Sequence, residues 1–201
     1  MSESVRLTLV SHAMTDAMAA GRFPRDEPLN ALGRRQVAAA ADLRPTVGSA
    51  DLRPTVGSAD LRPTVGSVCA PELRARQTAE LLGLPAETEP LLADLNCGLW
   101  RGRDLDGVEP AELVEWLTDP SLAPHGGESV VHLVERVRGW LGALGPRHGR
   151  LIAVTHPGVI RAAIVVALDA PPKSFWRIDI GPVSSTVMHL RGGAWTLRCT
   201  A

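Results

Sequence analysis

The stretch VRLTLVSHAMTD, residues 5–16, places a histidine directly behind a short apolar run. The apolar run is typical of a buried β-strand, and we expect a strand over 5–10. His12 then stands just beyond the end of that strand, followed by small and polar residues. Its imidazole is either a packed structural side chain or a group aimed at a ligand, and a single histidine does not decide between these roles.

Length and composition restrict the class of protein. The chain has 201 residues, enough for one sizeable core, and we assign 1–201 to a single domain. A formal net charge of −1 gives no global field for nucleic acid or anionic lipid, so neither partner is expected. No apolar window is long enough for a membrane span, and the N-terminus does not resemble a secretory signal. The three cysteines are too scattered for a disulfide framework, which favours a cytoplasmic location.

One nine-residue segment is repeated. ADLRPTVGS occurs three times without change, at 41–49, 50–58 and 59–67. Nine residues with one leucine and one valine lack a face that neighbouring repeats could bury. We therefore interpret 41–67 as an in-frame duplication in a surface loop. Closing a longer loop costs only about 0.6 kcal/mol per doubling, so the fold should tolerate the insertion.

The rest of the chain alternates strand and helix patterns. A cap at Asn30 starts the first long helix, and Gly83 ends the second. Alternation of strands and helices in this order predicts an α/β fold with helices on both faces of a sheet. The expected strands are 5–10, 66–70, 150–155 and 185–191, and the expected helices are Ala31–Leu43, Glu72–Leu82, Pro110–Leu117, Ser129–Leu144 and Pro157–Leu168.

A second histidine repeats the setting of the first. In LIAVTHPGVIR, residues 151–161, an apolar strand and a hydroxyl residue again precede a histidine, His156. Because ligands of open α/β sheets bind beyond the carboxyl ends of the strands, both imidazoles are expected at that rim. The helix after His156 points its positive end to the same place, which favours an anion. Of the other four histidines, only His125, before a Gly-Gly-Glu turn, remains a candidate.

The sequence resembles the histidine phosphatase superfamily, which includes the cofactor-dependent phosphoglycerate mutases. That family opens with Arg-His-Gly and continues with Ser-Pro-Leu-x-Arg-Ala-x-Gln-Thr-Ala, an acid before Gly-x-Trp-x-Gly, Gly-Gly-Glu, and Ser-His-Gly-x-Val-Ile-Arg. The matching segments here are SHA (11–13), APELRARQTAE (70–80), Asp94 before GLWRG (98–102), GGE (126–128) and THPGVIR (155–161). The resemblance covers nearly the whole chain apart from the repeated segment.

The resemblance implies both a fold and a chemistry. The fold would be a three-layer α/β/α sandwich with a mostly parallel central sheet. His12 would be the nucleophile that accepts a phosphoryl group, and Asp94 would be the general acid and then the base. Arg74 and His156 would bind the phosphoryl oxygens. No metal and no cofactor are expected. The substrate would be a small phosphorylated molecule, and a homo-oligomer is left open.

The departures from the family pattern gather around the expected phosphate. Ser11 replaces an arginine, Ala13 and Pro157 replace glycines, and Asp94 is one methylene shorter than the more usual glutamate. A lost charge-assisted hydrogen bond, about 1.5–3 kcal/mol, would slow the reaction roughly 10- to 150-fold.

Four further residues are expected to bind substrate: Ser11, Thr15, Arg22 and Arg25. Our hypothesis is that Arg25 or Arg22 restores part of the charge that Ser11 lacks. Pocket walls are expected from 16–27 and 103–128, with Trp100, Trp116 and Leu122 as contacts that are equally compatible with a core position.

Three functions follow from these observations. The first is a metal-independent histidine acid phosphatase-type phosphomonoesterase that works through phosphohistidine on His12, with activity reduced by the departures. The second is a catalytically quiet member that binds a phosphorylated ligand. The third is a phosphoglycerate mutase-like phosphotransferase, which ranks last because Arg22, Arg25 and Arg101–Arg103 are the only arginines available for a second phosphate.

Overall fold

A computed structural model describes residues 5–40, 65–144 and 149–198 of the chain. The predicted surface loop over 41–67 lies outside the described residues, except for its last three, which begin a strand. The segment follows the helix that ends at Ala39 and leads into the strand that starts at Val65.

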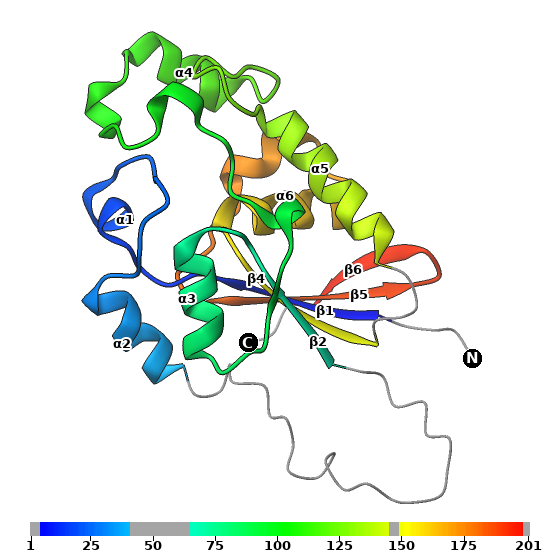
Figure 1. Cartoon of the computed structure of the whole chain (residues 1–201). Coiled ribbons are helices and arrows are strands. Elements are labelled where there is room, and N and C mark those ends of the chain that lie inside the picture. Colours follow the sequence, from blue (N-terminus) through cyan, green and yellow to red (C-terminus); the bar gives the residue numbers. More distant parts are fainter. Residues whose placement is uncertain (1–4, 41–64, 145–148, 199–201) are drawn as a thin grey trace, which may run out of the picture.

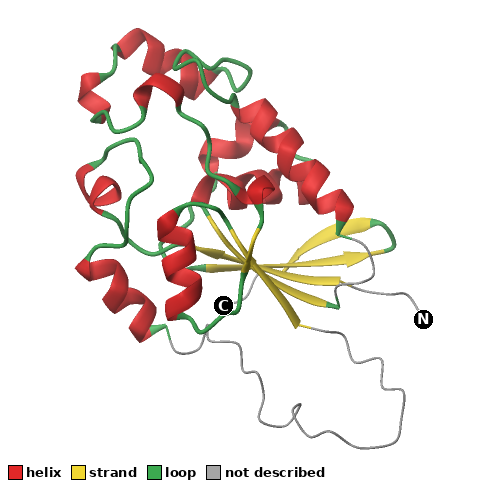
Figure 2. Cartoon of the chain, in the orientation of Figure 1, coloured by secondary structure: helices red, strands yellow, loops and turns green. Residues whose placement is uncertain are grey.

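A mixed six-stranded sheet forms the centre of the fold (Figure 2). Its strand order is β3-β2-β4-β1-β5-β6. The pairs β3–β2, β2–β4 and β4–β1 are parallel, whereas the pairs β1–β5 and β5–β6 are antiparallel. The bounds are β1 Val5–Ser11, β2 Val65–Cys69, β3 Glu87–Thr88, β4 Arg150–Thr155, β5 Ser185–Arg191 and β6 Ala194–Arg198.

Helices cover both faces of this sheet. The connections through α2 and α3 cross the sheet in one direction, and the connection through α4 and α5 returns in the other. Because such crossovers are right-handed, the two sets lie on opposite faces. Helices α5 and α6 pack on each other, as do α2 and α3 (Figure 1). The predicted α/β/α architecture is confirmed.

The α-helices are α1 Asp16–Ala20, α2 Ala31–Ala39, α3 Leu73–Leu81, α4 Pro110–Thr118, α5 Val130–Ala143 and α6 Pro157–Ala167. The short 3-10 turns are η2 Pro90–Leu92, η3 Gly98–Trp100, η4 Leu105–Gly107 and η5 Pro172–Arg177.

The helix ends follow the sequence signals closely. Asn30 Oδ1 accepts a hydrogen bond from the Gly33 amide at 2.8 Å, as a capping residue does. Gly83, just after α3, has a φ of +74°, which suits glycine. Helix α2 ends at Ala39, before the predicted end at Leu43. Helix α3 begins one residue later than predicted, because Glu72 keeps an extended backbone with φ −69° and ψ 146°.

Two apolar clusters stabilise the domain. The larger surrounds the sheet and includes Leu7, Leu9 and Val154, all with no solvent exposure. The smaller joins the segments beyond the carboxyl ends of the strands and consists of Phe23, Cys97, Trp100, Val108 and Trp116. Within the described ranges, no helix has the length and apolarity needed to cross a membrane.

The sequence patterns missed three short elements, namely α1, β3 and β6. β6 pairs with β5 and takes the edge position, so β5, which carries His189, is an interior strand of the sheet. The two-residue β3 and five-residue α1 are too short for periodicity to show.

Candidate active site

The two histidines of the predicted rim lie side by side. β1 and β4 are parallel neighbours in which Ser11 pairs with Thr155, so the next residue of each strand is a histidine. The His12 amide donates to the Thr155 carbonyl at 2.9 Å, which fixes the two strand ends together. The ring centroids of His12 and His156 are 5.0 Å apart, and both side chains are buried.

Two hydrogen bonds fix the protonation of the His12 ring. Nδ1 lies 2.8 Å from the Ala13 carbonyl, which can only accept, so Nδ1 carries the proton. Arg74 Nε donates to His12 Nε2 at 3.3 Å, so Nε2 offers a lone pair. Burial, together with the neighbouring His156 and Arg74, lowers the pKa of His12 to about 3. The ring is therefore a neutral base at pH 7, with Nε2 turned toward a guanidinium.

Arg74 connects the histidine to an acid. Its side chain, 2% exposed, projects from the first turn of α3. One terminal nitrogen donates to the Arg25 carbonyl at 2.8 Å and the other donates to Asp94 Oδ2 at 2.6 Å. Burial raises the pKa of Asp94, but His156 and Arg74 outweigh it and lower that pKa to about 2. Asp94 is therefore an ionised carboxylate in this arrangement.

A carboxylate that the sequence reasoning missed lies at the centre of the site. Glu72 Oε2 lies 2.8 Å from His156 Nε2, and Glu72 Oε1 accepts from the Asp94 amide at 3.0 Å. Asp94 Oδ2 lies 3.4 Å from the other ring nitrogen of His156, without the alignment of a hydrogen bond. Carboxylate oxygens thus face both nitrogens of His156. One signal was available, since Glu72 stands at the leucine position of the Ser-Pro-Leu-x-Arg motif.

Ser11 and Thr15 are buried in the same region but have local partners. Ser11 Oγ makes only a long contact of 3.4 Å with the His12 carbonyl. Thr15 Oγ1 caps α1 by accepting from the Met18 amide and donates to Glu27 Oε1 at 3.1 Å. Both hydroxyl groups therefore help to shape the turn that follows β1.

Arg22 and Arg25 lie on the loop beside the site, and no described contact joins either side chain to His12. Arg22 Nε is 3.7 Å from Asp104 Oδ1, and the Arg25 guanidinium packs against Gly102. A small hollow of about 160 Å³ lies between these arginines. Its remaining walls are Ala17, Phe23, Glu27 and Gly102. Arg25 is the link between this hollow and the histidine cluster, because it lines the hollow and its carbonyl accepts from Arg74.

Two of the departures from the family pattern have simple local accommodations. Among the described residues, only Asp169 and Val183 combine a side chain with a positive φ, so Ala13 is not strained in place of glycine. The Ala13 amide donates to Thr78 Oγ1 at 3.2 Å. Pro157 is the first residue of α6, where a missing N–H breaks no helix bond.

The aromatic residues proposed as pocket walls belong mainly to the smaller core cluster. Trp100 and Trp116 are 2% and 7% exposed, and their ring centroids are 5.6 Å apart. His125 is fully buried against both rings, and its Nδ1 accepts from the Gly127 amide. Leu122 is 41% exposed. Trp100, Trp116 and His125 therefore have packing roles, and only Leu122 presents a free apolar surface.

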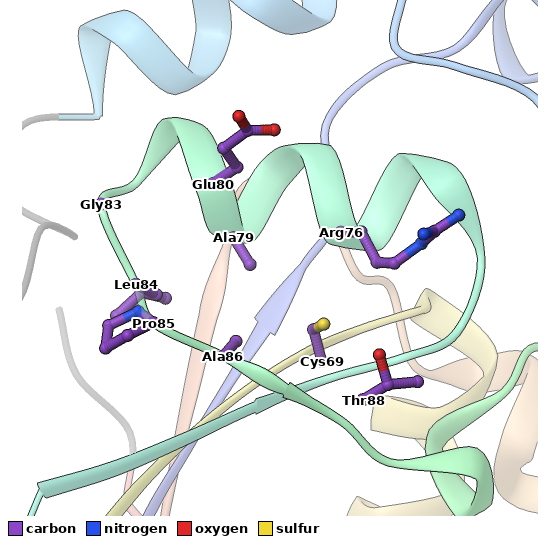
Figure 3. A pocket seen from close by; sticks show the side chains of 9 residues that line it. All are labelled: Cys69, Arg76, Ala79, Glu80, Gly83, Leu84, Pro85, Ala86 and Thr88. Carbon is purple, nitrogen blue, oxygen red and sulfur yellow. The ribbon is translucent and has the colours of Figure 1, made fainter.

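A larger hollow of about 590 Å³ lies between α3 and β3 (Figure 3). It contains none of the predicted site residues. Burial raises the pKa of its one thiol, Cys69, which keeps that group protonated and unreactive. Its lining consists of Cys69, Arg76, Ala79, Glu80, Gly83, Leu84, Pro85, Ala86 and Thr88. Within the described part of the chain, no three His, Cys, Asp or Glu side chains group as ligands for a metal ion.

The fold and the histidine–arginine–carboxylate cluster together define a class of protein. The model of the histidine phosphatase superfamily (branch 1) matches residues 7–201, and the chain belongs to that superfamily. It is 30% identical over 207 residues to a glucosyl-3-phosphoglycerate phosphatase of Mycolicibacterium vanbaalenii, with 93% of this chain and 84% of the relative covered. It is 27% identical to phosphoserine phosphatase 1 of Hydrogenobacter thermophilus, with 59% of each chain covered.

Solved structures agree with this assignment. A mycobacterial glucosyl-3-phosphoglycerate phosphatase in complex with VO3 superposes with a TM-score of 0.76 at 25% identity, with 96% of each chain covered. A second mycobacterial protein, described as hydrolase 2, superposes with a TM-score of 0.79 at 26% identity, covering 99% of this chain and 91% of its own. The family and these relatives support a phosphatase.

Proposed function

We propose that this protein hydrolyses a small phosphomonoester through a phosphohistidine intermediate on His12. The observation that carries the proposal is the state of the His12 ring. Its pKa is lowered to about 3, its Nδ1 proton is held by the Ala13 carbonyl, and its Nε2 lone pair faces Arg74. A neutral imidazole nitrogen beside a buried guanidinium is what in-line attack on phosphorus requires.

In the first half of the reaction, His12 Nε2 attacks phosphorus and the P–O bond to the leaving alcohol breaks. The departing alkoxide takes a proton from the Asp94 carboxyl group. In the second half, water attacks the phosphohistidine, Asp94 accepts its proton, and the P–N bond breaks to release inorganic phosphate. Arg74 and His156 bind the equatorial oxygens in both halves. General acid–base catalysis of this kind contributes typically about 10²- to 10⁴-fold.

Asp94 must gain a proton before it can act as the acid. Its pKa is lowered to about 2, mainly by His156 and Arg74. A phosphoryl group that engages Arg74 takes that guanidinium away from Asp94 and adds negative charge beside it, and both changes raise the pKa of Asp94. Hydrolysis by this route is therefore fastest on the acid side of neutrality.

The proposed substrate class rests on the size of the hollow and on the relatives. The space beside Arg22 and Arg25 is about 160 Å³, which suits a small leaving group. The relatives bear the names glucosyl-3-phosphoglycerate phosphatase and phosphoserine phosphatase. Both names denote small phosphomonoesters of hydroxy compounds, and we propose a substrate of that class.

The experiment is trapping of the intermediate. The protein is incubated with a panel of ³²P-labelled phosphomonoesters between pH 4 and 8, without added metal, and quenched in alkali, in which phosphohistidine survives. We expect acid-labile label in the wild type and in His132→Ala, and none in His12→Ala. Hydrolysis with no label on His12, or label that persists in His12→Ala, would contradict the mechanism.

A second candidate is a quiet member that binds a phosphorylated ligand. It is favoured by the Glu72 and Asp94 carboxylates, which already occupy the donors of His156 and Arg74. Such a protein would bind phosphoesters without turnover at any pH of the panel. The mutase-like function predicts transfer of the label to a second substrate hydroxyl instead of release as phosphate.

A further inference from the structure

Glu72 occupies the place where an anion would meet His156. Glu72 connects three segments of the chain, two through its carboxylate and one through its backbone. Oε2 contacts His156 Nε2 at 2.8 Å, Oε1 accepts from the Asp94 amide at 3.0 Å, and the backbone leads directly into α3 and Arg74. The side chain is 19% exposed, whereas that of His156 is fully buried. Glu72 is therefore held inside the site.

The charges around the Glu72 carboxylate do not favour the binding of a doubly charged anion in the site. Burial raises the pKa of Glu72, but the hydrogen bond and the charge of His156 outweigh it, and the net shift is downward. Glu72 and Asp94 are both ionised at neutral pH, and their charges offset those of Arg74 and His156 while His12 is neutral, so no net positive charge is left to hold a dianion. On the outer side, the carboxylate of Asp26 accepts from the Leu73 amide at the same helix end. A like charge near an ionised group disfavours the charged form.

Of the two carboxylates, Glu72 is the one that can gain a proton with the smaller loss of hydrogen bonds. Asp94 Oδ2 is bonded to Arg74 at 2.6 Å, and Asp94 Oδ1 accepts from the Leu95 amide. Glu72 Oε2 has no arginine partner, and its contact is His156 Nε2. A protonated Glu72 would keep its Oε1 bond to the Asp94 amide while its other oxygen became a donor.

We propose that Glu72 takes up one proton when a tetrahedral oxyanion binds, releases His156 Nε2 to that anion, and donates its own hydrogen bond to it. This inference rests on the proposed function, because it concerns the same phosphoryl site. It makes Glu72 an anion-binding residue that sets the pH range in which the site accepts an anion. As an ionised carboxylate it holds His156, and as an acid it binds the anion alongside His156.

Sulfate is a suitable probe, because it remains a tetrahedral dianion between pH 5 and 8. Its binding to the full chain is measured by titration calorimetry in buffers with different ionisation enthalpies, which gives the number of protons taken up. The variants are Glu72→Gln, which removes the titrating group, and Glu80→Gln as a control on the same helix, outside the site.

We expect the wild type and Glu80→Gln to take up about one proton more per sulfate at pH 7 than Glu72→Gln does. We also expect Glu72→Gln to bind sulfate about tenfold or more tightly at pH 7.5. A neighbouring like charge shifts a pKa by about one unit or more, and one unit corresponds to a factor of ten in the equilibrium. In Glu72→Gln, the decline of kcat/KM for phosphoesters above neutral pH should become shallower, and the part that comes from deprotonation of Asp94 should remain.

Two failures are distinguishable. If sulfate binds the wild type with no net proton uptake, or if Glu72→Gln binds it equally or more weakly with unchanged uptake, the inference about Glu72 is overturned while the phosphatase proposal stands. If neither sulfate nor phosphate binds the wild type and no phosphoester is hydrolysed, the proposed function fails, and the inference fails with it. No net proton uptake by the wild type overturns the inference even if Glu72→Gln does not fold. In that case Glu72→Leu, which restores the motif residue at this position, replaces it and separates uptake by Glu72 from uptake by Asp94.

Discussion

A buried neutral imidazole at position 12 makes the stability of this protein depend on pH in a particular way. The unfolded chain takes up a proton on His12 near the ordinary histidine pKa of about 6.5, whereas the folded chain does so only near pH 3. Between these values the unfolded state binds more protons, so acidification favours unfolding. The contribution of His12 to stability is fully present above pH 6.5 and is lost as the pH falls toward 3.

The size of this loss follows from the two pKa values. One pH unit corresponds to about 1.4 kcal/mol, so the whole interval from 6.5 to about 3 is worth roughly 5 kcal/mol. At pH 5 the loss is about 2 kcal/mol, and at pH 4 it is about 3 kcal/mol. Asp94, whose pKa is lowered to about 2, stays ionised over most of this range. The window from pH 7.5 to 5 therefore isolates the histidines from this carboxylate.

The assay is urea unfolding of the wild type and of His12→Gln at intervals of half a pH unit from 7.5 to 5. His12→Gln lowers the stability at every pH through lost packing, but it should lose about 2 kcal/mol less than the wild type across the window. His132→Gln, on α5 outside the site, is the matched control and should follow the wild type. Parallel stability curves for the wild type and His12→Gln would show that His12 is not a buried neutral base. Nε2 would then not offer the lone pair that the proposed reaction requires.

The other predictions concern the rest of the site and the repeated segment. Arg74→Lys keeps a positive charge but loses the planar fork that reaches both His12 and Asp94, and kcat/KM for hydrolysis should fall about 10- to 150-fold. Asp94→Asn should slow hydrolysis of alkyl phosphates about 10²-fold or more but affect aryl phosphates less, because an aryloxide leaves without a proton; equal losses would contradict the acid role. Arg22→Ala and Arg25→Ala test charge compensation, and unchanged hydrolysis in both would end that hypothesis. Deletion of 41–58 should leave activity unchanged and should not lower the midpoint of unfolding; loss of hydrolysis would mean that this segment lies near the site.

The sequence predicts the architecture well where elements are long and periodic. The strands that became β1, β4 and β5 and the helices that became α5 and α6 agree with their expected ranges to within one or two residues. These elements bury whole faces in the larger core, so their apolar periodicity is strong. Elements α1 and β3 have five and two residues, and patterns of that length are too short to stand out.

The positions of the candidate residues were predictable for a related reason. Because parallel strands present their carboxyl ends at one edge, a histidine after β1 and another after β4 had to meet there once the two strands were neighbours. What could not be predicted is the pairing of the polar groups within the site. Glu72 and His156 are 84 positions apart, and neither strand pairing nor helix periodicity specifies which oxygen meets which ring nitrogen.

The changes around the site act in one direction, and this explains how they can coexist with the proposed nucleophile, His12. Ser11 stands where the family motif has a cation, Glu72 adds an anion, and Pro157 lacks a backbone donor at the start of α6. All three would weaken the binding of a phosphoryl dianion in the ground state of the proposed reaction, yet none disturbs the two hydrogen bonds that orient His12. Binding lost equally from ground state and transition state raises KM without lowering kcat. Under the proposed function, more of the substrate affinity would then come from the leaving group, and we propose the hollow between Arg22 and Arg25 as the surface that supplies it.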